Sequence, residues 1–232
     1  MDADAAEDIT RRIQDLRLSL PPQVTLVAVT KLLPVEVIRI AYAAGLRHFG
    51  ENQVQEAMAK QALVRDLPDI TWHLIGHLQT NKIRKAVAHF QWIHSLDNLK
   101  LAEKLDQAAA DLGQSPQCCL QVKLVPDPPK YGFVLPQLEG DLPQLDQLTH
   151  LQIRGLMTIP PQGATNQTIG QVFSQAHDLA ATINQAHFNH IHIDQLSMGM
   201  SGDYPLAIAA GATMIRLGTT LFGPRPQKGN LT

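Results

Sequence analysis

Short runs of apolar residues alternate with longer amphipathic stretches along the whole chain. Residues 24–29 form a β-branched run typical of a buried strand, and Pro34 then opens a helix that places Val37, Ile38 and Ala41 on one face. The predicted strands are residues 24–29, 48–50, 71–75, 92–95, 118–124, 152–157, 191–196 and 213–217. The predicted helices between them are residues 34–44, 54–64, 81–88, 99–112, 135–148, 168–186 and 206–210.

Strict alternation of strands and helices predicts a parallel sheet with the helices outside, the pattern of the α/β class. Eight repeats in 232 residues match the repeat count, and nearly the size, of a closed (β/α)8 TIM-type barrel. A doubly wound open sheet is the alternative. No long linker divides the chain, so we expect a single domain over residues 1–232, with the barrel at about residues 22–222.

The two ends of the chain are expected to meet where an eighth helix would lie. Residues 217–232 are broken by several glycines and prolines, so no full helix fits after the last strand. Residues 5–18 are helical in pattern, and Ile9, Ile13 and Leu16 share one face. We therefore expect an extra N-terminal helix that packs in the place of the missing one.

The composition of the chain indicates its cellular compartment and the classes of partner that it does not suit. Charged residues make up 17% of the chain and the net charge is −2, so no basic surface attracts nucleic acid or anionic lipid. The longest apolar runs are strand-sized, and the acidic start of the chain does not resemble a signal peptide. The two cysteines, Cys118 and Cys119, are neighbours, which rarely bond to each other. We expect a cytoplasmic protein without nucleic-acid or membrane partners.

The candidate chemistry begins at Lys31. Active sites of such barrels lie at the C-terminal ends of the strands, and Lys31 directly follows the first strand. Burial beside apolar walls lowers the pKa of a lysine, and a neutral amine condenses with carbonyl compounds. A solvated lysine at a strand end is the simpler interpretation of this residue taken alone.

Two glycine-containing loops add a phosphate site. Residues 197–203 follow the seventh strand and enter a helix, and Gly218 and Thr219 follow the eighth strand. Glycines let a backbone approach closely, serine hydroxyls donate hydrogen bonds, and helix N-termini attract anions. Each loop alone is an ordinary turn. Together they stand where barrels often bind phosphate, which favours a phosphorylated ligand.

Arg216 lies one residue before the end of the eighth strand, beneath the predicted phosphate site. If the phosphorylated ligand carries a pyridine ring, a guanidinium facing the ring nitrogen donates a hydrogen bond to it and keeps the ring unprotonated. An unprotonated ring is a poorer electron sink. An ion pair between Arg216 and a carboxylate inside the barrel is the alternative.

Several sequence runs, in the same order, resemble the pyridoxal phosphate homeostasis protein family over about residues 5–226. These runs are Val29-Thr30-Lys31, Phe49-Gly50-Glu51-Asn52, residues 72–82, Gly155-Leu156-Met157, residues 196–203 and Arg216-Leu217-Gly218-Thr219. Residues 123–132 look particularly like the cyanobacterial branch. His77 departs from the family pattern, in which another residue, often proline, is common.

The resemblance implies a barrel like the N-terminal domain of alanine racemase, with pyridoxal 5'-phosphate (PLP) held by Lys31 as a Schiff base. It also implies that Arg216 is the partner of the ring nitrogen. The phosphate contacts that it implies are Ser197, Ser201, Gly218 and Thr219, and the further residues lining the cofactor are Asn52, His73 and Met198. No metal ligand and no catalytic residue are expected.

The function implied is binding, buffering and delivery of PLP in the cell, with an influence on amino-acid and keto-acid balance. PLP-dependent apoenzymes or a regulatory protein are the partners that this role suggests, and we expect a monomer. A small PLP-dependent enzyme, such as a weak amino-acid racemase using Tyr131 or Tyr204 as an acid, is the alternative. A Schiff-base aldolase ranks last, because aldolase lysines normally lie on later strands.

Overall fold

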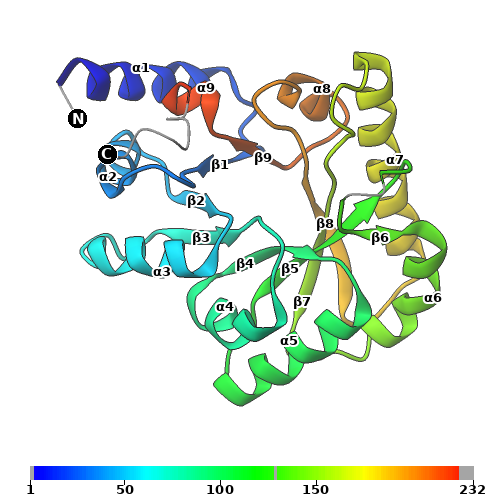
Figure 1. Cartoon of the computed structure of the whole chain (residues 1–232). Coiled ribbons are helices and arrows are strands. Elements are labelled where there is room, and N and C mark those ends of the chain that lie inside the picture. The colour runs from blue at the N-terminus through cyan, green and yellow to red at the C-terminus, as the bar shows by residue number, and fades with distance from the viewer. Residues whose placement is uncertain (1–2, 128–129, 225–232) are drawn as a thin grey trace.

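Eight parallel strands close into a barrel. The computed structural model describes residues 3–127 and 130–224, so Pro128 and Pro129 of the family-like run and residues 225–232 lie outside the described residues. The strands follow the order β4-β3-β2-β1-β9-β8-β7-β5, and β4 also pairs with β5, which closes the ring (Figure 1). The bounds are β1 Thr25–Val29, β2 His48–Glu51, β3 Thr71–Leu74, β4 Trp92–Leu96, β5 Gln117–Lys123, β7 Gln152–Met157, β8 Ile191–Ser197 and β9 Met214–Leu217. The predicted barrel is confirmed, and an open sheet is excluded.

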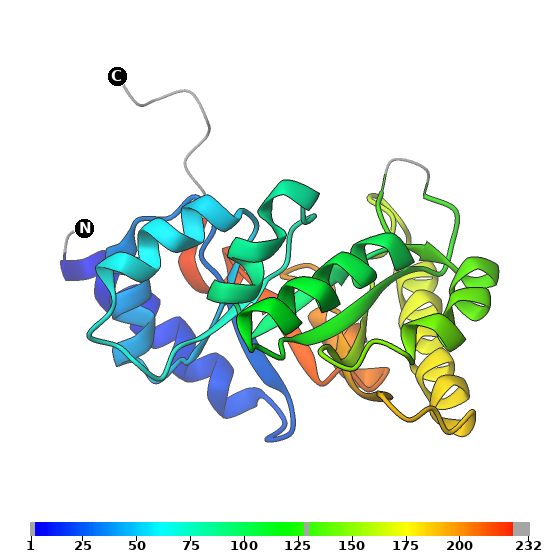
Figure 2. The same ribbon diagram turned by 90° about the horizontal axis from the view of Figure 1, so that it is seen from below.

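Helices surround the strands. Their bounds are α1 Ala3–Ser19, α2 Val35–Ala43, α3 Val54–Leu63, α4 Ile83–His89, α5 Leu99–Leu112, α6 Leu135–Leu145, α7 Asn166–Gln185, α8 Tyr204–Ala209 and α9 Thr219–Phe222. Seen from below, α1 and α2 lie at one side of the barrel and α6 and α7 at the other (Figure 2). Each long helix begins and ends within a few residues of its predicted position.

Three local features differ from the predicted pattern. The helix expected from residue 81 begins with a 3-10 turn, Thr80–Lys82, before α4, and a two-residue strand, β6 Phe133–Val134, pairs with β5. Helix α6 ends three residues early, where Asp146 accepts hydrogen bonds from the backbone amides of Asn189 (3.1 Å) and His190 (2.7 Å). The Asp146 side chain thus ties the end of α6 to the loop before β8.

The strands alternate between two apolar regions. On β1, Leu26 and Ala28 belong to the large core that packs under the helices. The inward positions form a smaller cluster inside the barrel, made of Trp92, Cys119, Met157 and Met214. Because successive side chains of a strand point to opposite faces, this separation follows from the period of two. Cys118 and Cys119 are both buried, unbonded core residues, one in each region.

Helix α1 takes the expected place beside the barrel. It packs against α2 and against the four-residue helix α9, near the join between the first and last strands (Figure 1). Ile9, Ile13 and Leu16 are buried there, Ile13 completely. The apolar stripe of α1 therefore covers the strands that a full eighth helix would otherwise cover.

Candidate functional site

A pocket of about 300 Å³ opens at the C-terminal ends of the strands. Its walls are Val29, Lys31, Asn52, Ile75, Ile159, Met200, Ser201, Gly202, Arg216, Gly218 and Thr219. Six of the nine residues predicted from the sequence line this pocket: Lys31, Asn52, Ser201, Arg216, Gly218 and Thr219. Segments more than 180 positions apart in the sequence thus meet at one end of the barrel, as the rule for barrel active sites predicts.

The backbone on both sides of Lys31 is held by helix α3. Leu32 has a left-handed conformation (φ 62°), which is unfavourable for a branched residue, and its amide donates to Glu56 Oε1 at 2.6 Å. On the other side, the carbonyl oxygen of Thr30 accepts a hydrogen bond from Lys60 Nζ at 2.8 Å. These two contacts fix the turn that presents Lys31 to the pocket.

Behind this turn lies a buried ion pair that the sequence did not predict. Lys60 Nζ lies 2.8 Å from Glu51 Oε1, and the Thr30 hydroxyl donates to the same oxygen at 2.7 Å. Glu51 is fully buried, and burial raises the pKa of its carboxyl group against the opposing effects of Lys60 and Thr30. Its second oxygen, Oε2, is buried and has no hydrogen-bond partner among the described residues. The cluster connects β1, β2 and α3 directly behind Lys31.

Asn52 is positioned by a close backbone contact. A Cβ atom added to Gly76 would lie 2.3 Å from the carbonyl oxygen of Asn52, so only glycine allows the loop after β3 to press against Asn52. The Gly-containing run at residues 72–82 therefore has a structural reason at this end of the barrel.

The loops after β8 and β9 form a cradle of hydrogen-bond donors. The backbone amides of Ser201, Gly202 and Thr219 donate to no other described residue. The Ser201 hydroxyl accepts from the amide of Thr220 at 3.2 Å, which ties the two loops together. Gly199 turns the chain with φ 93°, and a Cβ there would lie 2.7 Å from Ala207 Cβ. Open amides at this position suit an anionic group.

Arg216 brings a buried positive charge to the pocket wall. Its side chain is 4% exposed, and it donates from NH1 to Ser197 Oγ at 2.6 Å and from NH2 to the Thr158 carbonyl at 3.2 Å. Burial lowers its pKa to about 10, so it stays protonated at neutral pH. No carboxylate forms an ion pair with Arg216 within residues 3–127 and 130–224. The predicted alternative, an ion pair inside the barrel, is not observed.

Three predicted site residues, His73, Ser197 and Met198, lie behind the pocket wall. His73 and Ser197 are fully buried in the barrel interior, one layer below the residues at the mouth. Met198 is 1% exposed, and its amide donates to the carbonyl of Met214 at 3.1 Å. The family resemblance implied that they contact the cofactor directly, but the barrel stacks its inward side chains in layers, and these belong to a lower layer or to the packed core.

Apolar wall residues were missed by the sequence reasoning. Val29, Ile75, Ile159 and Met200 line the pocket, and each stands at or just after a strand end. Their position was the one available signal, since aliphatic side chains at strand ends are equally typical of packing.

The side chains considered for other chemistry lie elsewhere. Tyr131 is exposed and its ring stacks on His77 at 3.6 Å between centroids, outside the pocket that Lys31 lines. Tyr204 begins helix α8 and does not line the pocket either. Asp194, near three histidines in the sequence, pairs with Arg154. No group of metal-ligand side chains is found within the part of the chain that the structure describes.

A closed barrel with a pocket at the C-terminal ends of its strands defines a class of protein, and comparisons with known proteins show which class this is. Residues 5–226 match the family model described as alanine racemase, N-terminal domain. An alanine racemase of Clostridium difficile shares the fold with a TM-score of 0.73 at 15% identity, over 97% of this chain and 58% of its own.

Relatives with higher identity narrow the assignment. A pyridoxal phosphate homeostasis protein of Synechocystis is 52% identical over 207 residues, which are 89% of this chain and 94% of the relative. The structure of PipY from Synechococcus elongatus with PLP bound has a TM-score of 0.89 at 56% identity, and covers 93% of this chain and 100% of PipY. The chain belongs to the pyridoxal phosphate homeostasis protein family, which confirms the resemblance seen in its motifs.

Proposed function

We propose that this protein binds PLP in the pocket at the C-terminal end of the barrel, with Lys31 forming a Schiff base, and that it serves intracellular PLP homeostasis and delivery. The observation that carries the proposal is Arg216, a buried cation that has no carboxylate partner among the described residues, on the wall of a pocket that also contains a lysine and a cradle of amides. A buried charge of this kind calls for an acceptor in the pocket.

Each part of the pocket suits one part of PLP. Arg216 would donate to the ring nitrogen, and the amides of Ser201, Gly202 and Thr219, together with Gly218, would hold the phosphate. When bound, the cofactor supplies an electron sink for carbanion chemistry, which an unprotonated ring supplies weakly. Asn52 lines the same wall. Ser197, His73 and Met198 act from behind, Ser197 by fixing the Arg216 side chain and the other two by packing and hydrogen bonding.

A carrier fits the pocket better than a racemase. Racemisation needs acid and base groups on opposite faces of the cofactor, and neither Tyr131 nor Tyr204 lines the pocket. Incubation of PLP-loaded protein with amino acids in deuterated buffer should leave the α-hydrogen in place. Its rapid replacement, lost in Lys31→Arg, would instead favour the enzyme.

The cellular setting extends this proposal. No helix in residues 3–127 or 130–224 is long and apolar enough to cross a membrane. A single-domain, monomeric, cytoplasmic carrier that hands PLP to apoenzymes, or that responds to a regulatory protein, is the form we propose. Sedimentation of the purified protein at several concentrations tests the monomer, since a mass near 51 kDa, twice the 25.5 kDa of one chain, would mean a dimer.

The decisive test is chemical. Borohydride reduction of the PLP-loaded protein followed by peptide mapping should place a stable pyridoxyl group on Lys31. Lys31→Arg keeps the positive charge but cannot condense, so it should give no adduct. Lys130→Arg is the matched control, because Lys130 lies at the same end of the barrel but bonds to the carbonyl of Pro160 at 2.8 Å. Full labelling of Lys31→Arg would overturn the assignment.

A further inference from the structure

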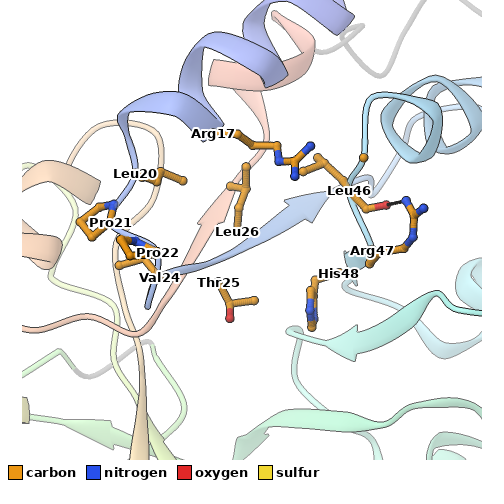
Figure 3. A pocket seen from close by; sticks show the side chains of 11 residues that line it. Arg17, Leu20, Pro21, Pro22, Val24, Thr25, Leu26, Leu46, Arg47 and His48 are labelled. Carbon is orange, nitrogen blue, oxygen red and sulfur yellow. Dashed lines mark hydrogen bonds between the residues drawn. The ribbon is translucent and has the colours of Figure 1, made fainter.

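A second pocket, of about 350 Å³, lies at the opposite, N-terminal end of the barrel. Figure 3 shows its walls: Arg17 from α1, Leu20, Pro21, Pro22 and Val24 from the following turn, Thr25 and Leu26 from β1, and Gly45, Leu46, Arg47 and His48 at the entrance to β2. Two arginines and a histidine line it, and no aspartate or glutamate does. Among the described residues, the lining of this pocket is therefore basic and contains no acidic side chain.

The two arginines differ in how far they are neutralised. Arg47 donates from Nε to Asp69 Oδ2 at 2.6 Å and from NH1 to the carbonyl of Tyr42 at 3.0 Å. Arg17 donates from NH1 to the carbonyl of Ala44 at 3.0 Å, and it forms no ion pair within the described residues. Arg17 thus supplies the pocket with a positive charge that no carboxylate balances.

His48 connects this pocket to the barrel interior. Its Nδ1 lies 3.0 Å from His73 Nε2, and His73 Nδ1 lies 2.8 Å from His94 Nε2. His94 Nδ1 lies 2.7 Å from Ser197 Oγ, which in turn accepts from Arg216 NH1 at 2.6 Å. A continuous row of hydrogen bonds, which we call the histidine row (His48, His73, His94 and Ser197), thus runs from the N-terminal pocket to Arg216 in the pocket of Lys31.

The histidine row contains neutral imidazoles. His73 and His94 are fully buried, and burial lowers the pKa of His48, of His73 and of His94, the last to about 3. A neutral imidazole donates from one nitrogen and accepts at the other, so each ring passes on the direction of the hydrogen bond that it receives.

Arg216 sets that direction. A guanidinium can only donate, so Ser197 Oγ is an acceptor toward Arg216. The Ser197 hydroxyl has one other side-chain partner among the described residues, and its hydrogen therefore goes to His94 Nδ1. His94 must then donate from Nε2 to His73, and His73 from Nε2 to His48 Nδ1. The remaining hydrogen of His48 is on Nε2, whose residue lines the N-terminal pocket and which has no partner within the described residues.

The polar side chains of this pocket thus present donors from both sides of β1: the Arg17 guanidinium on the side of α1, and the Nε2–H of His48 and the Thr25 hydroxyl on the other side (Figure 3). We propose that the N-terminal pocket binds a small oxyanion, a carboxylate or a phosphate, at the Nε2–H of His48, attracted by the positive charge of Arg17 on the other side of β1, and that the histidine row couples its occupancy to Arg216. An acceptor at His48 strengthens each hydrogen bond along the row, because hydrogen bonds in series polarise one another. The binding site stands independently, whereas an effect on the cofactor rests on the function proposed above.

The direction of the row is tested first, by long-range ¹H–¹⁵N spectra of the histidine rings in the intact protein. His48, His73 and His94 should each carry hydrogen on Nε2 and none on Nδ1. Hydrogen on Nδ1 of His48 would remove the donor from the pocket and overturn the proposal.

Binding is tested by titration with sodium malonate and, separately, with inorganic phosphate, against sodium chloride at equal ionic strength. The ring nitrogens of His48 should shift with saturation, and those of His94 and Arg216 should follow with the same apparent Kd. The amides of Ser201, Gly202 and Thr219 report binding at the other pocket, so the two sites, and the success of the two proposals, are read separately. The oxyanion with the lower Kd at His48 indicates whether carboxylates or phosphates are the natural class.

Two variants separate the site from general charge effects. Arg17→Gln should weaken the titration seen at His48 several-fold, since the positive charge that attracts the anion is lost, and leave that of Gly202 unchanged. Arg11→Gln, on an exposed part of the same helix and outside the pocket, is the matched control and should bind as the wild type does. His48→Gln should retain weak binding but abolish the shift at His94. Equal binding by wild type and Arg17→Gln would overturn the site, and a shift of His48 without one of His94 would overturn the coupling.

Discussion

Arg216 is a buried cation, and burial of a charge costs free energy. Its hydrogen-bond partners are the hydroxyl of Ser197 and the carbonyl of Thr158. Arg216→Gln removes the desolvation cost of a buried charge but also two hydrogen bonds, so its urea midpoint should stay close to that of the wild type. Retention of PLP should fall by at least about tenfold, since one charged donor is lost. Equilibrium dialysis and urea unfolding measure the two effects.

The outcome that would count against this view is the reverse pattern, a less stable variant with unchanged PLP affinity. Arg154→Gln is a suitable control, because Arg154 forms a partly exposed pair with Asp194 away from the pocket.

The buried imidazoles make stability depend on pH. His94 has a pKa of about 3 in the folded protein and about 6.5 when exposed, so the unfolded chain binds its proton more tightly. Stability from this residue is complete above about pH 6.5 and is lost as the pH falls toward 3, by about 1.4 kcal/mol per pH unit. His73 and His48 act in the same direction.

His94→Gln should therefore reduce the slope of the unfolding free energy against pH between about pH 6 and pH 4. The expected reduction is about 1.4 kcal/mol per pH unit, the contribution of one proton. Urea unfolding at several pH values measures the slope. An unchanged slope in the variant would mean that His94 is not the titrating group.

At the residue scale, the sequence identifies which side chains have a chemical role better than it predicts which side chains contact one another. Lys31 and Arg216 are identifiable because each stands at a strand end with a side chain of distinctive chemistry. The partnership of His94 with His73 and Ser197 is not, because it depends on the register of β3, β4 and β8, which a single sequence does not state. Glu51 and Lys60 were missed for the same reason.

Among the elements, α3 has the most direct effect on the site, since it holds the residues on both sides of Lys31. Glu56→Ala releases the amide of Leu32, whose left-handed conformation then loses its support. PLP affinity should fall several-fold while the thermal midpoint changes by only a few degrees. Glu36→Ala is the control, because Glu36 is an exposed glutamate on α2 whose side chain forms no hydrogen bond with any described residue.

The contrary outcome is that Glu56→Ala loses as much stability as a buried large-to-small substitution and binds PLP as tightly as the wild type. Glu56 would then contribute to packing and not to the position of Lys31. Isothermal titration with PLP and a thermal melt on the same samples decide between the two.

The regular elements follow from apolar periodicity, which is why α5 and β7 begin and end where they were predicted. The exceptions arise where a specific contact overrides periodicity. Helix α6 ends at Leu145, where Asp146 binds the loop before β8, and the pairing of Phe133 and Val134 with β5 makes a strand too short to leave a pattern.

At the scale of the whole molecule, the burial of α1 predicts how much this helix contributes to the stability of the closed barrel. Ile13 is fully buried between α1 and its neighbours, whereas Leu18 on the same helix is 88% exposed. Ile13→Ala should cost about 2–5 kcal/mol of unfolding free energy, and Leu18→Ala less than about 0.5 kcal/mol. Chemical denaturation of the two variants measures the difference, and equal costs would show that α1 is not part of the cooperative unit.

The closed barrel itself could be predicted because eight strand-and-helix repeats leave few other arrangements. What could not be predicted is how side chains from distant strands meet in the interior, including the row that joins His48 to Arg216. Inward positions on different strands are neighbours only after closure, and their contacts leave no local signal.

The pairing of β1 with β9 has a consequence for how the chain is made. Leu26 pairs with Ile215, so the first strand waits for a partner that leaves the ribosome nearly 190 residues later. At about 5–20 residues per second this delay is on the order of 10–40 seconds, during which one edge of β1 has no native neighbour. The barrel therefore cannot close before β9 has been synthesised, and until then β1 presents an apolar strand edge of the kind that is prone to non-native pairing.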